Sequence, residues 1–392
     1  MWDAAAVWTN AGHRLPALLG LAVLLGGCSG GGTTGSVEPG ASDLIASGSS
    51  APSATMTAGG TLVDVPEGRI LFHRMGSDGV EHYFTINTDG TDERALFDAE
   101  GCGCARFAPD GTQVWTMGST GHGTWSFTTM EADGSDRVVV EPPIDTLNLG
   151  PAASNTDGDW VAFNGWDETD PSRAGVYLGS PDLADLRLVT PLPDGTVEAE
   201  PFGVTPDGDH VLFFADREGT EHHEGDLYIV NADGSGLRQL NPPGTTHSWL
   251  NVPGGSLSPD GRRVAFTVAD AVFVADVEGG DARRITEGTG FTWAVSWSPT
   301  GDWIVYTRQH GTTSVISLIR PDGSDEVEIS AADGSDEAAG AVWSPAGDAL
   351  LALRRSDDGD DLWIMDLDGQ FLAQVTHEPA TYGTYSWAPP SP

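Results

Sequence analysis

Short apolar segments separated by tight turns recur along the chain from about residue 66 to its end. In the clearest copy, the turn Ser258-Pro259-Asp260-Gly261 joins a segment at 256–257 to an apolar segment at 264–266. Proline sets the φ angle of a turn's second position, aspartate suits the third, and glycine adopts the left-handed conformation that closes a bulged hairpin. The pattern therefore predicts two antiparallel strands joined by a turn.

The same turn returns at intervals along the chain. Its glycines are 40 to 53 residues apart, at positions 111, 158, 208, 261, 301 and 347. After the turn at 206–208, segments at 210–214, 226–230 and 237–240 predict a second, third and fourth strand. Four strands in a repeat of this length are typical of a β-propeller blade, so we expect an all-β propeller.

The residues of the repeat also resemble a known family. Ser-Pro-Asp-Gly is followed by an apolar-Ala-Phe segment, by a strand with Tyr228 or Trp363 among Ile and Leu, and by Asp-Gly-Ser and an Arg-x-Leu segment. This order resembles the WD40-like PD40 repeat of TolB-type β-propellers, from about residue 66 to the end. The resemblance implies a propeller, and TolB's own propeller has about six blades.

The two ends of the repeat region complete each other. Residues 69–73 resemble a second strand that lacks a first strand before it, and residues 385–389 resemble a first strand with nothing after it. We expect the C-terminal strand to complete the first blade and close the ring, which removes a sheet edge. This count predicts seven blades; because the copy at 154–158 is degenerate, six blades is the alternative.

The N-terminus predicts export and a lipid anchor. His13 and Arg14 precede an apolar segment at 15–25, and Leu25-Gly26-Gly27-Cys28 resembles the lipobox of bacterial lipoproteins. That resemblance implies a signal peptide at 1–27 and a lipid on Cys28. A flexible Gly/Ser/Thr-rich tether would follow at 28–65, before the propeller at 66–392. We expect an extracytoplasmic protein of the cell envelope that contacts the membrane through its lipid alone.

The charge of the chain excludes several classes of function. Its formal net charge is −40, and all 18 basic residues are Arg, with no Lys. The absence of Lys excludes Schiff-base chemistry and a P-loop, and the lack of a basic stripe argues against a nucleic-acid partner. The acidity itself is typical of a soluble exported protein.

Chain direction assigns the loops to two faces. One face, the turn face, contains the loops between first and second strands and between third and fourth strands. These loops are minimal Pro-Asp-Gly or Asp-Gly turns without the ligand spacing of a calcium loop, so we expect the turn face to be structural. The opposite loop face has the long, irregular loops on which binding groups concentrate. We expect recognition there, around the mouth of the central channel. The candidate binding residues are His73, His82, His122, Trp166, His222, His223, His247, Trp249, Trp293, His310, His377 and Tyr382.

Two smaller groups on the loop face have their own chemistry. Glu221, His222, His223 and Glu224 offer imidazole and carboxylate ligands for a divalent metal, although adjacent side chains on a loop seldom converge on one ion. Cys102 and Cys104 would form a tight, strained disulfide in an oxidising compartment or stay as two free thiols.

These observations favour a binding scaffold over an enzyme. The repeat region at 66–392 contains no G-x-S-x-G elbow for a hydrolase, and we predict no cofactor, although a divalent metal remains open. We expect a monomer that recognises another envelope protein or an exported polymer such as a polysaccharide. The alternative is a metal-dependent carbohydrate-active enzyme similar to oligogalacturonate lyase, which rests on the His and acidic residues of the loop face.

Overall fold

The computed structural model describes residues 65–76, 79–99, 104–119, 125–219, 224–248, 255–268, 270–288, 290–311, 313–330, 337–356, 359–378 and 380–389. These residues belong to one compact unit and form 29 strands and one short 3-10 helix, η2 (Pro171–Arg173). None of the described residues forms an α-helix, and therefore none forms a helix that could span a membrane. The predicted signal peptide and nearly all of the predicted tether lie outside the described residues.

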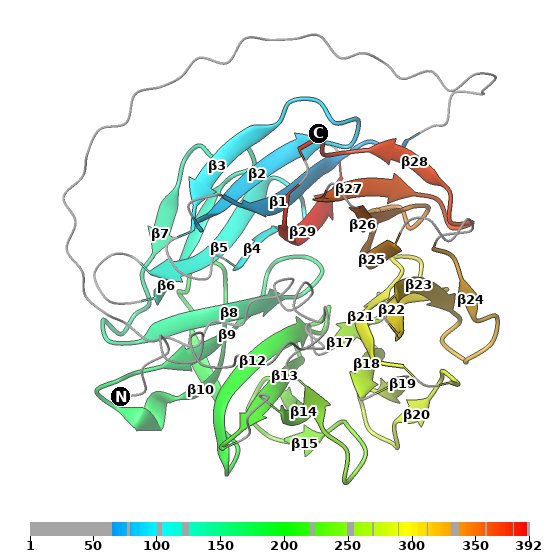
Figure 1. The fold of residues 1–392 in the computed structure, drawn as a ribbon. Coiled ribbons are helices and arrows are strands. Elements are labelled where there is room, and N and C mark those ends of the chain that lie inside the picture. Colours follow the sequence, from blue (N-terminus) through cyan, green and yellow to red (C-terminus); the bar gives the residue numbers. More distant parts are fainter. Residues whose placement is uncertain are drawn as a thin grey trace, which may run out of the picture. The chain divides into compact units, whose positions relative to one another are not determined.

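The strands form seven antiparallel sheets, which are the seven blades of a β-propeller (Figure 1). The first blade contains β29 (Tyr382–Ala388), β1 (Arg69–Met75), β2 (Glu81–Asn87) and β3 (Arg94–Asp98). The second, third and fourth blades contain β4 (Cys104–Phe107), β5 (Gln113–Ser119), β6 (Trp125–Glu131) and β7 (Val138–Val140); β8 (Asn148–Ser154), β9 (Val161–Trp166), β10 (Gly175–Gly179) and β11 (Arg187–Pro191); and β12 (Thr196–Val204), β13 (His210–Arg217), β14 (Glu224–Asn231) and β15 (Arg238–Gln239), with β16 (His247–Ser248) pairing with β14.

The remaining three blades follow the same meander. They contain β17 (Gly255–Leu257), β18 (Arg263–Val268), β19 (Ala271–Asp276) and β20 (Arg283–Arg284); β21 (Thr292–Trp297), β22 (Ile304–His310), β23 (Thr313–Ile319) and β24 (Val327–Glu328); and β25 (Glu337–Trp343), β26 (Leu350–Ser356), β27 (Gly359–Met365) and β28 (Phe371–Gln374). The all-β, seven-bladed prediction is therefore confirmed. The degenerate turn at 154–158 joins β8 to β9 and belongs to a complete blade.

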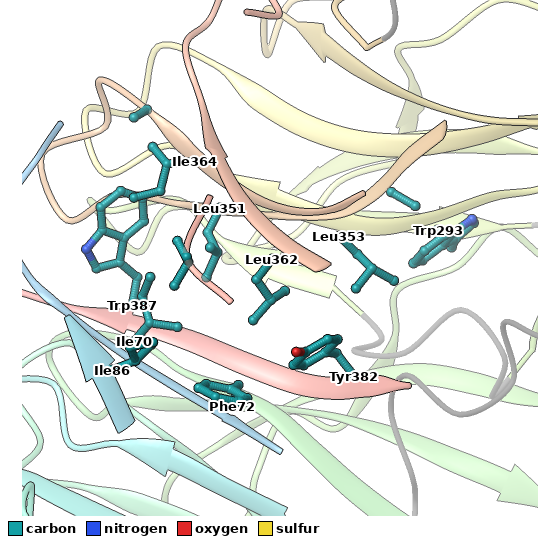
Figure 2. Close-up of a cluster of buried hydrophobic side chains, with 13 residues drawn as sticks. Ile70, Phe72, Ile86, Trp293, Leu351, Leu353, Leu362, Ile364, Tyr382 and Trp387 are labelled. Carbon is teal, nitrogen blue, oxygen red and sulfur yellow. The ribbon is translucent and has the colours of Figure 1, made fainter. Parts of the chain in front are cut away.

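Apolar side chains hold neighbouring blades together. The second strand β18, for example, is buried at every position after the first, because it lies in a sheet covered on both faces. Seven clusters of buried side chains fill the seven junctions between neighbouring blades, including the junction between the last blade and the first. Figure 2 shows that junction, where Leu351 and Leu362 of the last blade lie near Phe72, Tyr382 and Trp387 of the first.

Strand β29 closes the ring as predicted. It pairs with β1 in antiparallel register from Arg69 opposite Ala388 to Arg74 opposite Tyr382, with an irregularity between Phe72 and Arg74. The C-terminal segment is thus the first strand of the first blade, and the backbone groups on that edge of β1 are paired rather than exposed.

The turn face is built from the Pro-Asp-Gly turns. Asp260 Oδ1 accepts hydrogen bonds from the Arg262 N–H at 3.1 Å and from the Ser258 hydroxyl at 2.6 Å, and Gly261 has a φ of +68°. This confirms the prediction that the Asp-Gly pairs are turns. Neighbouring blades also touch at this face, because a turn glycine lies against the proline that follows the first strand of the preceding blade. These contacts are Gly111 on Pro389, Gly158 on Pro109, Gly261 on Pro206, Gly301 on Pro259 and Gly347 on Pro299.

Candidate functional site

The inner strands of six blades enclose a cavity of about 410 Å³ in the central channel. Its walls come from β8, β12, β17, β21, β25 and β29. Several wall positions are glycine or alanine, so no long side chain projects from them; they are Gly203, Gly255, Ala294, Gly340 and Ala341. The cavity is therefore space that the inner strands leave unfilled.

The cavity extends to the turn face. Thr156 and Pro259 belong to turns, line the cavity and are exposed to solvent, which places a mouth at this face. Toward the loop face the wall includes Trp293 and Tyr385, and both side chains lie close to Gly340. The Tyr385 hydroxyl donates a hydrogen bond to the Gly340 carbonyl, and burial raises the pKa of Tyr385.

The lining of this cavity is uncharged. Among the described residues that line it there is no Asp, Glu, Arg or His, although the whole chain has 58 acidic residues. Aromatic surface comes from Phe202, Trp293 and Tyr385, and hydroxyl groups come from Ser154, Thr156, Ser256, Ser258, Ser296 and Thr384. Such a lining can hold an apolar group and hydrogen-bond to polar atoms on it, but it cannot form an ion pair.

Four residues predicted on the loop face are instead buried: His73, His247, Trp293 and Tyr382 have exposed fractions of at most 4%. His73 lies on the face of β1 that packs toward the second blade, with its ring 5.2 Å from the Tyr83 ring, and no described group accepts or donates a hydrogen bond at either nitrogen. Burial lowers the pKa of His73 to about 4. The Tyr382 hydroxyl donates to the Glu378 carbonyl, and Trp293 is the one residue of this group that lines the cavity.

His247 is a structural residue between the fourth and fifth blades. It lies in β16, where its backbone pairs with Gly225 near the start of β14. Its Nδ1 atom is 2.7 Å from the Thr267 carbonyl, and its ring packs edge-on against Phe214 at 5.5 Å. Burial lowers the pKa of His247 to about 4, with an opposing effect from the Thr267 hydrogen bond.

Three predicted histidines do lie at the surface. His82 is partly exposed, with Nδ1 2.5 Å from Asp98 Oδ1; His310 is exposed, with Nε2 3.1 Å from Glu328 Oε1; and His377 is exposed. They belong to different blades and do not form one cluster. In the described part of the chain, no group of three or more His, Cys, Asp or Glu side chains is arranged to hold a metal.

Two tryptophans form a partly exposed aromatic pair on the loop face. Trp166 ends β9 and Trp125 begins β6, and their ring centroids are 6.2 Å apart at an angle of 57°. The Asn148 side chain joins the two segments, because its Oδ1 accepts from the Trp125 N–H at 2.8 Å and its Nδ2 donates to the Trp166 carbonyl at 3.4 Å. The sequence predicted Trp166 but not Trp125, which follows the His122 loop.

Other predicted residues lie outside the described part of the chain. They are Cys28, Cys102, His122, Glu221, His222, His223 and Trp249, and nothing is described of the Cys104 side chain either. Glu224 is the first residue of β14. The base of the loop that contains His222 and His223 is held by Arg217, whose Nε and Nη2 donate to Asp226 Oδ2 at 2.9 and 2.6 Å.

A group of buried or half-buried carboxyl groups on β12 and β13 was not predicted. Burial raises the pKa of Glu198 to about 8, and the nearby charges of Glu200 and Asp216 add to the effect. Asn164 Nδ2 donates to Glu198 Oε1 at 2.9 Å, which opposes the shift. The alternation at 196–200 places Glu198 and Glu200 on one side of the strand, and this pattern was the available signal.

Comparisons with known proteins support the fold. No family model matches the chain. The protein Atu1656 of Agrobacterium fabrum, named as uncharacterized, is 26% identical over 207 residues, or 48% of this chain and 65% of that protein. The chain therefore spans less than two thirds of the length of this curated relative.

Similar solved structures include two kinds of propeller protein. TolB from Acinetobacter baumannii has a TM-score of 0.52 at 15% identity, over 82% of this chain and 67% of that one. An oligogalacturonate lyase from Vibrio parahaemolyticus has a TM-score of 0.55 at 12% identity, over 76% and 91%. An oligogalacturonate lyase in complex with manganese has a TM-score of 0.52 at 12% identity, over 79% and 86%. The resemblance to TolB-type propellers is confirmed at the level of the fold.

Proposed function

We propose that this protein is a binding scaffold of the bacterial cell envelope, anchored outside the cytoplasm by a lipid on Cys28. The lipobox-like sequence before Cys28 supports this location, and the lack of a basic stripe argues against nucleic-acid partners. Its partner is another envelope protein, recognised by the loop face.

The Trp125–Trp166 pair is the observation that favours this function. Partly exposed tryptophans on rigid strands supply large contact area with little loss of conformational entropy, and such residues dominate the free energy of protein interfaces. The side chains stand at the ends of β6 and β9, and the Asn148 hydrogen bonds hold their backbones in place. The loop face therefore has a preorganised aromatic surface.

Cross-linking from intact envelopes tests this function. We expect the full chain to capture one stoichiometric envelope protein, and Trp166→Ala to reduce that capture by about tenfold or more, in the range of an interface hot spot. A matched control is Trp303→Ala, since Trp303 lies at the turn face, beneath the Arg320 guanidinium. Equal capture by the two variants would contradict the proposal, whereas Trp166-dependent binding of a polysaccharide would identify an exported polymer as the partner.

A metal-dependent carbohydrate-active enzyme is the second candidate function. The structural similarity to an oligogalacturonate lyase solved with manganese favours it, and Glu221, His222, His223 and Glu224 are the proposed ligands. Turnover of oligogalacturonate with manganese that a chelator abolishes, and that His222→Ala also abolishes, would establish this function. Absence of turnover by the manganese-loaded protein would rule out this second function.

A further inference from the structure

We propose that the channel cavity is a second binding site, for an uncharged, largely apolar small molecule that enters from the turn face. The site is separate from the loop-face surface of the Trp125–Trp166 pair. A ligand bound there is additional to the protein partner of the loop face.

The size and lining of the cavity match a small-molecule site. A volume of about 410 Å³ lies within the range of pockets that hold such ligands. Phe202, Leu257 and Val342 offer an apolar wall from three different blades, and Trp293 and Tyr385 add aromatic surface on the side toward the loop face. Because the blades are rigid sheets, the wall is preformed and a ligand needs little reorganisation of the protein to bind.

The charge distribution selects an uncharged ligand. An anion would approach a chain of net charge −40 and find no Arg among the described lining residues to compensate it. A cation would be attracted to the surface but would lose its hydration among apolar side chains without gaining a carboxylate partner. Both kinds of ion are therefore disfavoured inside, and a neutral molecule is not.

The polar atoms of the lining indicate that the ligand accepts hydrogen bonds. Trp293 is 4% exposed and its indole nitrogen is fully buried, so the donors that face the cavity are the hydroxyl groups of the lining. Ser296 and Ser256 bring hydroxyl groups to the same wall, although Ser256 Oγ already accepts from the Trp297 N–H at 3.1 Å. A ligand with a carbonyl, ether or neutral aryl-amine group on an apolar body would use these donors.

A pair of naphthalene dyes tests both the site and its charge preference. N-phenyl-1-naphthylamine is neutral, and 8-anilinonaphthalene-1-sulfonate has a closely similar ring system with an added anionic group. We expect the full chain to bind the neutral dye saturably, with one site per chain by fluorescence titration, and to bind the sulfonate about tenfold more weakly or less. Equal binding of the two dyes, or no saturable binding of the neutral dye, would overturn the proposal.

Filling the cavity tests the location. Val342→Trp places an indole in the channel and should weaken binding of the neutral dye by about tenfold or more, while Val138→Trp, at an outer-strand position that is 53% exposed, should not. Ser296→Leu is a smaller filling variant that serves if Val342→Trp unfolds. Unchanged dye binding in a folded filling variant would place the dye elsewhere and refute the site.

The same variants separate this site from the loop-face function. Val342→Trp should leave capture of the envelope partner unchanged, and Trp166→Ala should leave dye binding unchanged. Loss of both properties in one folded variant would contradict two separate sites.

Discussion

The imidazole ring of His73 on β1 packs directly against the Cα atom of Gly383 on β29, so closely that a methyl group at Gly383 would overlap the ring. Gly383→Ala should therefore destabilise the closed ring by about 1–3 kcal/mol, the usual cost of overpacking. Gly118→Ala on β5 is the control, since a methyl there meets nothing within 4 Å. Urea unfolding of wild type, Gly383→Ala and Gly118→Ala measures the difference. Equal midpoints for Gly383→Ala and wild type would contradict the prediction, because they would mean that the His73 ring can move away without loss of stability.

Acid should weaken the protein through two buried histidines, His73 and His247. The pKa of His73 and that of His247 are about 4 in the folded chain, whereas an unfolded histidine has a pKa of about 6.5. Between those values the unfolded state binds more protons, so the free energy of unfolding falls as pH falls from about 6.5 to about 4, by about 3 kcal/mol for each residue.

His73→Phe isolates the contribution of one ring. The variant keeps a ring of similar size and loses no hydrogen bond, because no described group bonds to His73. We expect its loss of stability between pH 7 and pH 4.5 to be smaller than that of wild type by about 2 kcal/mol or more. His310→Phe, at an exposed position, should behave like wild type in the same urea titrations. Parallel curves for His73→Phe and wild type would contradict the assignment.

Glu198 should act in the opposite direction. Its pKa of about 8 in the folded chain exceeds the unfolded value of 4.5, so the folded state binds more protons between these values and stability falls as pH rises. Glu198→Gln keeps an acceptor for Asn164 and should stabilise the protein at pH 8.5 by about 2 kcal/mol, with little effect at pH 4.5. Glu278→Gln, at an exposed position, is the control. A gain of equal size at both pH values would mean that the charge of Glu198 is not the cause.

Removal of β29 should abolish cooperative folding. A chain that ends at Thr381 loses Tyr382, Trp387 and Ala388 from two junctions and leaves an edge of β1 unpaired, at a cost of about 5 kcal/mol or more. A chain that ends at Pro389 is the control. Addition of a synthetic peptide of residues 382–389 to the shorter chain should restore a cooperative thermal transition. A cooperative transition of the shorter chain without peptide would show that the ring does not need its closing strand.

The fold could be predicted because its signals are local and repeated. The Pro-Asp-Gly turn at 259–261 specifies a hairpin by its own backbone chemistry, and its recurrence determines the blade length. Closure of the ring could be predicted because residues 69–73 resemble a second strand without a first, and residues 385–389 resemble a first strand without a second.

The candidate site was less predictable, because it depends on side-chain direction and on contacts between blades. A position near the end of a strand does not say whether a side chain points outward or between sheets: His73 lies on the same face as Leu71 and is buried, while Trp166 is partly exposed. The channel cavity needs residues from six blades that are distant in sequence. Its signal was the series of small residues in the first strands, at 203, 255, 294 and 340, which has meaning only once the strands surround a channel.

Gly111 contacts Pro389, so the residues at the end of β29 touch the second blade as well as the first. Strands β1 and β29 are paired across more than 300 residues of chain, from Arg69 to Ala388. For the exported protein proposed above, a polypeptide that crosses a membrane N-terminus first cannot assemble this blade until β29 has also crossed. The ring would then close on the outer side of that membrane, after the C-terminal strand has crossed. Chaperones that shield the unpaired edge of β1 until then would also act on the outer side.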